Sequence, residues 1–110
     1  MTMEAQIQDL IDKFHRKVEK DESLREKIYP VDKTANIDLG EEHYSLHVHE
    51  AKVTDFKPEL LEKADITLIT TPETMEALLN GTLRPMRAFV MKKIKVKGKI
   101  DDIMFLKELF

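Results

Sequence analysis

The side chains best suited to chemistry lie close together in the first half of the chain. His43, Ser45, His47 and His49 occupy alternate positions, so an extended strand would place all four on one face. Two imidazoles that lie about 7 Å apart along a strand need a third ligand from a neighbouring strand before they can hold zinc. No helical His-Glu-x-x-His motif supplies another zinc site. The spacing favours a solvated polar strand face, and we expect no metal site.

The same strand places a serine beside histidines, which is the start of a nucleophile–base pair. Ser45 does not lie in the Gly-x-Ser-x-Gly turn that presents such a serine in many hydrolases. The chain has no cysteine and only three glycines, which excludes thiol catalysis and leaves no glycine-rich phosphate loop. We therefore expect a protein that is not an enzyme and that needs no cofactor.

Positive charge is concentrated in one segment. Residues 84–100 hold seven of the 18 basic residues and no acid, so the other 93 positions carry 11 basic and 21 acidic residues. Such a cluster could contact phosphates or the head groups of an anionic membrane. The alternatives are pairing with the surplus acids and protection of a sheet edge by lysines. We expect no nucleic acid partner, because the rest of the chain is acidic and no aromatic side chains accompany the lysines.

Length and composition predict a single domain over residues 1–110. A chain of 110 residues with 42% hydrophobic residues can bury a core without disulfides or metals. No apolar run approaches the roughly 18 residues of a membrane span, and the first 20 residues lack the apolar block of a signal peptide. These features favour a cytoplasmic protein.

Hydrophobic periodicity predicts an α+β fold. Apolar residues at a helical spacing, from Ile7 to Val18, predict a first helix, and a change to period two after Pro30 predicts strands. Thr71 and Pro72 are a typical helix start, and Gly81 a typical helix end. The expected architecture is a five-stranded, mostly antiparallel sheet covered by helices. The predicted helices are 2–20, 72–80, 85–92 and 101–110, with a short turn to residue 28, and the strands are 35–39, 44–49, 51–56, 64–70 and 93–98.

Ordered motifs in the second half resemble the sterol carrier protein type 2 family of lipid-transfer domains. They are Ala-Asp-Ile-Thr at 64–67, Gly-Thr-Leu-Arg-Pro at 81–85, Ala-Phe at 88–89 and Lys-Ile-Lys-Val-Lys-Gly at 93–98. The family has an Ala-Asp-x-Thr strand, a helix that ends in Gly-Lys-Leu-x-Pro, an Ala-Phe helix and a Lys-rich strand in the same order. The resemblance implies an apolar cavity between a sheet and its helices.

By this resemblance the chain binds or transfers a lipid, a fatty acyl chain or an acyl-CoA without catalysis. Three of the apolar side chains expected to line the cavity are methionines, which repack easily around varied ligands. The expected lining residues are Leu68, Met75, Leu78, Leu79, Met86, Phe89, Val90, Ile94, Met104 and Leu106. The residues expected to contact a lipid head group or an anionic membrane are Arg84, Arg87, Lys92, Lys93, Lys95 and Lys97.

The last predicted helix leaves an alternative open. Ile103, Met104, Phe105 and Leu106 are consecutive and point nearly all round a helix, so one core cannot bury them all. They could face a ligand, a membrane or a second copy of the chain, or fold over the edge of the domain. A dimerisation or accessory module that serves a separate enzyme is therefore the second hypothesis, and a homodimer is one assembly compatible with it.

Overall fold

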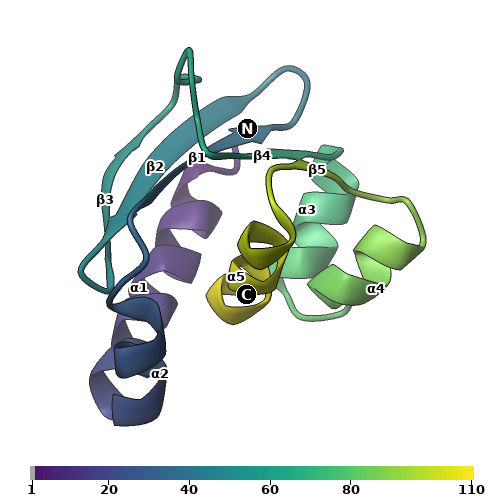
Figure 1. The fold of residues 1–110 in the computed structure, drawn as a ribbon. Coiled ribbons are helices and arrows are strands. Elements are labelled where there is room, and N and C mark those ends of the chain that lie inside the picture. Colours follow the sequence, from purple (N-terminus) through teal and green to yellow (C-terminus); the bar gives the residue numbers. More distant parts are fainter. Residues whose placement is uncertain (1) are drawn as a thin grey trace.

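All the described helices lie on one side of a five-stranded sheet (Figure 1). The computed structural model describes residues 2–110, apart from the side chains of Ile100, Ile103 and Leu106. The elements in chain order are α1 (Glu4–Lys20), α2 (Glu22–Ile28), β1 (Lys33–Asp38), β2 (His43–His49), β3 (Lys52–Lys57), β4 (Ile66–Ile69), α3 (Pro72–Leu79), α4 (Pro85–Val90), β5 (Lys95–Lys97) and α5 (Ile100–Leu109). The expected order of helices and strands is confirmed. Within residues 2–110, no helix combines the length and the apolar character that a membrane span requires.

The sheet is mixed, with the strand order β3-β2-β1-β4-β5. Three of the four neighbouring pairs are antiparallel, and β1 and β4 are parallel. The expected mostly antiparallel sheet is thus confirmed. The parallel pair arises because the chain leaves the outer strand β3, crosses the sheet and adds β4 on the free side of β1. This places β1 at the centre, with Ile37 opposite Tyr44 on one side and Leu68 on the other.

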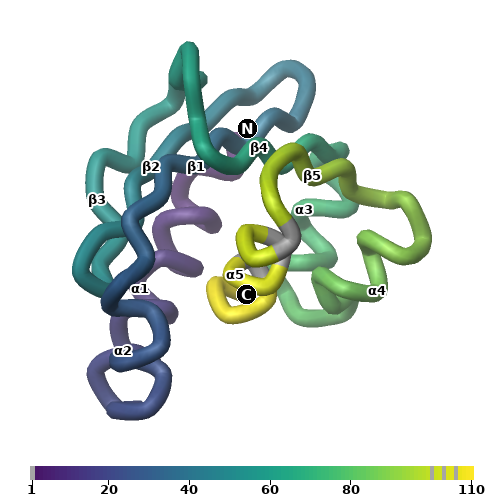
Figure 2. Tube along the Cα trace, in the orientation of Figure 1, coloured from purple at the N-terminus to yellow at the C-terminus, as the bar shows by residue number. Residues whose placement is uncertain are grey.

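The hydrophobic core lies between α1 and the inner face of the sheet. The predicted stripe on α1 is buried, including Ile7, Ile11 and Phe14. Alternate residues of β1, β2 and β4 point toward it, among them Leu46 and Ile66. Figure 2 shows the last helix, α5, which contacts α1 and α4 and completes the helical layer.

The start of α1 is fixed to the β1–β2 turn by one carboxylate. Glu42 Oε1 accepts hydrogen bonds from the Met3 backbone N–H, at 2.7 Å, and from the Tyr44 hydroxyl, at 2.6 Å. Both bonds hold the pKa of Glu42 below its ordinary value, since they favour the carboxylate. Burial and the Glu42 hydrogen bond raise the pKa of Tyr44 to about 12. This contact orients the N-terminal end of α1 on the sheet.

The outer face of the central strands is partly covered by the segment that links β3 to β4. Asn36, which is buried on this face of β1, accepts from Leu61 N–H at 2.8 Å and donates to Leu61 C=O at 2.9 Å. Asp65 accepts from the backbone and the hydroxyl of Thr34, and these bonds lower the pKa of Asp65. Side chains of β1 thus hold residues 58–65, which we call the crossing segment, in place.

Two expectations for α4 and β5 are wrong. The spacing predicts that Met86, Phe89 and Val90 point inward, but they are exposed, and the buried residue of α4 is Ala88. This short helix lies at the edge of the fold, where a methyl group makes the close contact. The last strand begins at Lys95 instead of Lys93, because Lys92 has a φ of 60° and the Lys93 N–H bonds to Ala88 C=O. Such a turn ends a helix, so these residues are not available to the strand.

Replacement of Asn36 by alanine is expected to destabilise the fold by about 2 kcal/mol, because two hydrogen bonds are lost and the Leu61 backbone loses both partners. Urea denaturation followed by circular dichroism measures the change in the free energy of unfolding. The control is Gln8→Ala, at an exposed hydrogen bond on α1, with an expected effect within about 0.5 kcal/mol. Equal effects for the two variants would show that Asn36 does not hold the crossing segment.

Candidate functional site

An enclosed apolar pocket lies between α1, the inner face of the sheet and the end of α5. Its volume is about 20 Å³ and its wall exposes no polar surface. Leu10 on α1, Leu46 on β2 and Phe110 just after α5 are on three different sides of it. The full lining is Ile7, Leu10, Ile11, Ala35, Asn36, Ile37, Leu46, Ile66, Leu68, Leu109 and Phe110.

The small volume indicates that this pocket is closed. About 20 Å³ holds one water-sized group, whereas pockets that enclose small-molecule ligands usually measure about 300–1,000 Å³. The structure therefore shows a closed pocket whose walls nearly touch. A longer ligand could enter only if one wall moved away from the others.

Among the described residues, the end of α5 has only exposed polar contacts to the rest of the fold. The Lys27 ammonium lies 2.8 Å from Glu108 Oε1, and Lys17 Nζ donates to Glu108 C=O at 3.2 Å. The Lys27 side chain is 65% exposed, so solvent and salt screen this ion pair and it contributes little stability. Leu109 is buried and Phe110 half-buried at the pocket, so apolar packing is the main contact that holds this end.

The beginning of α5 is held more firmly. Asp102 is buried and accepts a hydrogen bond from the Lys99 backbone N–H at 2.9 Å, which caps the first turn. The Lys33 ammonium lies 3.6 Å from the same carboxylate. A Cβ at Gly98, where φ is 152°, would approach Asp102 Oδ2 to 3.0 Å, so glycine is needed for this close contact. The helix is thus anchored at its start and loosely held at its end.

The structure separates the residues expected to line a cavity into three groups. Leu68 lines the closed pocket. Met75, Leu78 and Ile94 are buried in the core, and Leu79 is half-buried beside it. The remaining described residues are exposed, namely Met86, Phe89, Val90 and Met104, and the side chain of Leu106 lies outside the described part of the structure.

Sequence reasoning did not identify most of the pocket wall. Ile7, Ile11 and Ile37 are recognisable as inward-facing by their periodicity, but the same signal serves a solid core and a pocket wall. Leu109 and Phe110 are recognisable only as apolar residues of the last helix. Which apolar residues surround a space depends on how α1 and α5 meet over the sheet, and no local pattern encodes that.

The exposed apolar residues of α4 adjoin the basic segment. An open groove of about 560 Å³ follows α4 and β5 and is lined by Phe89, Val90, Lys92, Ile94, Lys95 and Val96. The six cations expected at head groups are all exposed, and none pairs with an acid in the described part of the chain. We call the exposed apolar residues 86 and 89–91 together with these six cations the α4–β5 surface.

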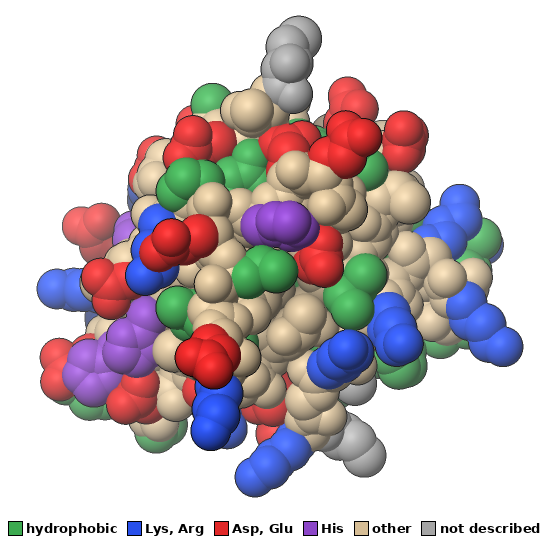
Figure 3. Space-filling model, turned by 90° about the horizontal axis from the view of Figure 1, so that it is seen from above, with side chains coloured by type: hydrophobic (Ala, Val, Ile, Leu, Met, Phe, Trp, Pro, Cys, Tyr) green, Lys and Arg blue, Asp and Glu red, His purple; other side chains and the backbone are tan. Residues whose placement is uncertain are grey.

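Charge is unevenly distributed over the face of the molecule seen in Figure 3. Most Lys and Arg side chains of this face lie in its right-hand and lower parts, and Asp, Glu and His occupy much of the left and upper parts. Among the described residues no ion pair joins the six cations to an acid, so the structure does not show the alternative in which surplus acids pair with the basic segment. Protection of the edge strand β5 by Lys95 and Lys97 remains compatible with it.

The serine–histidine arrangement does not form a nucleophile–base pair. Ser45 is completely buried, and its hydroxyl has no hydrogen-bond partner in the described structure. His43 and His47 turn to carboxylates instead, with His43 Nε2 at 3.4 Å from Asp38 Oδ1. A substrate could not reach this hydroxyl without unfolding of the strand.

One family of known proteins matches the chain by sequence. Residues 11–110 match the sequence model of the SCP-2 sterol transfer family. None of the curated proteins compared with the chain matches it in sequence.

Solved structures share the fold. The crystal structure of sterol carrier protein 2 like 2 from Aedes aegypti is 19% identical, with a TM-score of 0.64, over 99% of this chain and 100% of that one. Sterol carrier protein domain 2 of Helicoverpa armigera is 26% identical, with a TM-score of 0.60, over 94% and 84% of the two chains. The sec-alkylsulfatase Pisa1 from Pseudomonas sp. is 20% identical, with a TM-score of 0.64, over 78% of this chain. The match spans only 14% of the alkylsulfatase chain.

Two substitutions distinguish the buried from the exposed residues among those expected to line a cavity. Met75→Ala is expected to lower the free energy of unfolding by about 2–5 kcal/mol, because Met75 is fully buried. Val90→Ser is expected to change it by less than about 0.5 kcal/mol, because Val90 is 74% exposed. Chemical denaturation of both variants measures the two values. A large loss of stability in Val90→Ser would contradict the exposed position of α4.

Proposed function

Because this chain belongs to the SCP-2 sterol transfer family, we propose that it is a non-catalytic carrier that binds one lipid in the pocket between α1, the sheet and α5. The observation that carries this proposal is the enclosed, wholly apolar pocket, one wall of which ends in the loosely held residues 108–110. The Asn36 amide bonds to Leu61 on the outer face of β1, so the pocket exposes only apolar surface. Such a pocket selects an apolar chain and offers nothing to activate a reaction. The carrier needs no cofactor for this role.

The ligand is a fatty acyl chain, as the free acid or as the apolar part of an acyl-CoA. A related Aedes aegypti protein, SCP2L2, has a solution structure in its palmitated form and is 22% identical to this chain. A narrow space between α1 and the strands suits a flexible chain, which can follow the gap as it opens. The chain would displace Leu109 and Phe110 and replace their contacts with the core by its own.

Entry requires the end of α5 to move while its start stays anchored at Asp102. The two lysines that contact Glu108 are exposed, so water easily replaces their contacts with it. The free energy of moving this end is therefore set by the apolar area that Leu109 and Phe110 bury, and a bound acyl chain offsets this cost by covering the same part of the core. Binding is in this way coupled to displacement of the end of α5.

The α4–β5 surface brings the carrier to an anionic membrane or to the head group of the ligand. Its exposed apolar side chains can enter the interfacial region of a bilayer, and the six cations around them are attracted by anionic lipids. Each basic residue near such a surface contributes about 1 kcal/mol. Because α4 contacts α5, docking at this surface occurs beside the movable wall of the pocket.

A second candidate is an accessory module of an enzyme. The alkylsulfatase match supports it, since there a fold like this one occupies a small part of a longer chain. The module would then bind the enzyme through the α4–β5 surface, or would form a dimer with a second copy of itself. Light scattering of the purified protein distinguishes a lone carrier from a dimer.

Palmitate binding tests the pocket. We expect native mass spectrometry to detect one bound palmitate at micromolar concentration, and displacement of a fluorescent fatty acid to give the affinity. Ala35→Leu adds three carbons to the wall of the closed pocket and should weaken binding roughly tenfold or more, with a loss of about 1–3 kcal/mol of stability. Ala5→Leu, the same change on the exposed face of α1, should leave binding unchanged. A folded protein that binds no acyl chain would disprove the proposal.

Vesicle binding tests the α4–β5 surface. The double variant Lys93→Glu/Lys95→Glu should reduce binding to vesicles that contain phosphatidylglycerol by at least about thirtyfold, because the loss of two positive charges alone corresponds to about 2 kcal/mol. Lys20→Glu/Lys63→Glu, which reverses two exposed charges outside this surface, should have a much smaller effect. Sedimentation with vesicles measures both, and neutral phosphatidylcholine vesicles give the baseline. If both double variants lose binding equally, only net charge matters and the surface has no specific role.

A further inference from the structure

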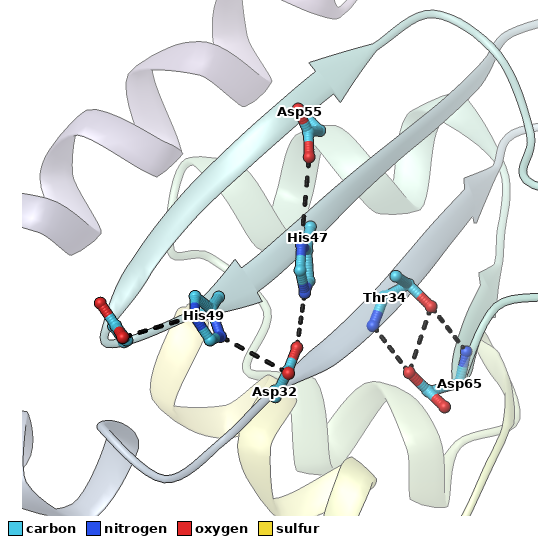
Figure 4. A network of polar contacts seen from close by, with 7 residues as sticks. Asp32, Thr34, His47, His49, Asp55 and Asp65 are labelled. Atoms are coloured by element: carbon cyan, nitrogen blue, oxygen red, sulfur yellow. Dashed lines mark hydrogen bonds and ion pairs between the residues drawn. The ribbon is translucent and has the colours of Figure 1, made fainter.

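Three side chains on the outer face of the sheet form a cluster with metal-ligand chemistry. Asp32, His47 and His49 each offer one ligand atom, and these atoms all lie within 4.8 Å of one another. Asp32 contacts both rings, since Oδ1 lies 2.5 Å from His47 Nε2 and Oδ2 lies 3.5 Å from His49 Nδ1. Figure 4 shows Asp32 between the two histidines.

The sheet register explains why these residues meet. His47 and His49 are two positions apart on β2, so both project from its outer face, and their ring centroids lie 5.7 Å apart. Lys33 of β1 pairs with Val48, which brings the preceding residue, Asp32, alongside His49. The two histidines alone could not hold a metal ion, and the third ligand is Asp32, which lies in the α2–β1 connection just before β1 begins.

Each histidine also has a carboxylate at its other ring nitrogen. His47 Nδ1 lies 3.9 Å from Asp55 Oδ2, and His49 Nε2 lies 3.5 Å from Glu50 Oε1. Carboxylates in this position orient metal-binding histidines, because they accept the N–H of the nitrogen that does not bind the metal. The arrangement leaves His47 Nε2 and His49 Nδ1 directed at the same point, where Asp32 lies.

Unusual backbone geometry brings both outer carboxylates to the rings. Glu50 has a φ of 51° in the β2–β3 turn. Asp55 has a φ of 56°, and the register of β2 and β3 shifts between Ser45 and His47, as at a β-bulge. Regular alternation after Thr54, which pairs with His47, would direct Asp55 to the inner face. The irregularity instead points its carboxylate toward His47.

We propose that Asp32, His47 and His49 bind one Zn²⁺ ion through His47 Nε2, His49 Nδ1 and an Asp32 oxygen, with water as the remaining ligand. A site of two imidazoles and one carboxylate favours zinc, because magnesium and calcium prefer sites made of oxygen ligands alone. The side chain of His47 is 31% exposed, that of His49 51% and that of Asp32 62%. The ion can therefore reach all three, and the rings can rotate to bonding distance.

The charges around the cluster favour a divalent cation. Asp32, Glu50 and Asp55 place three carboxylates around the two imidazole rings. Bound zinc replaces the direct contact between Asp32 and the two rings, so the acid and the imidazoles gain a common partner. The ion would connect the α2–β1 connection to β2 on the face of the sheet opposite the lipid pocket.

Zinc titration of the purified protein, after treatment with EDTA, tests the site. Isothermal titration calorimetry should show one Zn²⁺ per chain, and binding should be lost in His47→Ala and in His49→Ala. The matched control is His43→Ala, on the same strand and face, where the ring contacts Asp38 instead of Asp32. Wild-type protein that takes up no zinc, or histidine variants that bind it as the wild type does, would overturn the proposal.

Two further measurements separate binding at this site from adventitious binding. Asp55→Asn should weaken zinc binding by roughly tenfold, since it removes the carboxylate behind His47, and asparagine tolerates the positive φ. Zinc should raise the melting temperature of the wild type and of His43→Ala but not of His47→Ala. Palmitate binding should be the same in all these variants, so a failure of the zinc site and a failure of the carrier function are distinguishable.

Discussion

The structure depends on the burial of β1 from both sides. This strand is central in the sheet, with β2 on one side and β4 on the other. Its inner face is covered by α1 and faces the apolar pocket, and its outer face is partly covered by the crossing segment that Asn36 holds. A buried strand needs all its backbone groups paired and both faces filled. The remaining elements are arranged to meet these two requirements.

Local patterns are sufficient to predict most of the elements and one face of the core. The stripe on α1, the Thr71–Pro72 start of α3 and the left-handed Gly81 depend on residues close in sequence, and the structure confirms them. The orientation of α4 could not be predicted in this way. Its Met86, Phe89 and Val90 have the spacing of a buried stripe, yet a contact through Ala88 turns them outward. In α4, tertiary packing and not the local spacing of apolar residues determines which face is buried.

Sites that join distant segments are the hardest to predict. The pocket combines α1, three strands and the last two residues, so its position follows from how the layers meet. The cluster on the outer face is similar, because the spacing of His47 and His49 is visible in the sequence but the register that brings Asp32 beside them is not. The β-bulge that turns Asp55 toward His47 has only a weak sequence signal, since aspartate tolerates a positive φ but is also common where the backbone is regular.

The strand order has a consequence for how the chain folds. The hairpin of β1 and β2 has a short connection, but β4 joins β1 only after about thirty more residues have been made. During synthesis the N-terminal part, α1 to β3, leaves the ribosome first, while the β1 edge that will receive β4 has unpaired backbone groups. An open edge of this kind can pair with another chain. We therefore expect newly made protein to be most prone to aggregate in the interval before residues 66–69 emerge, and the non-local pairing of β4 with β1 to form more slowly than the helices.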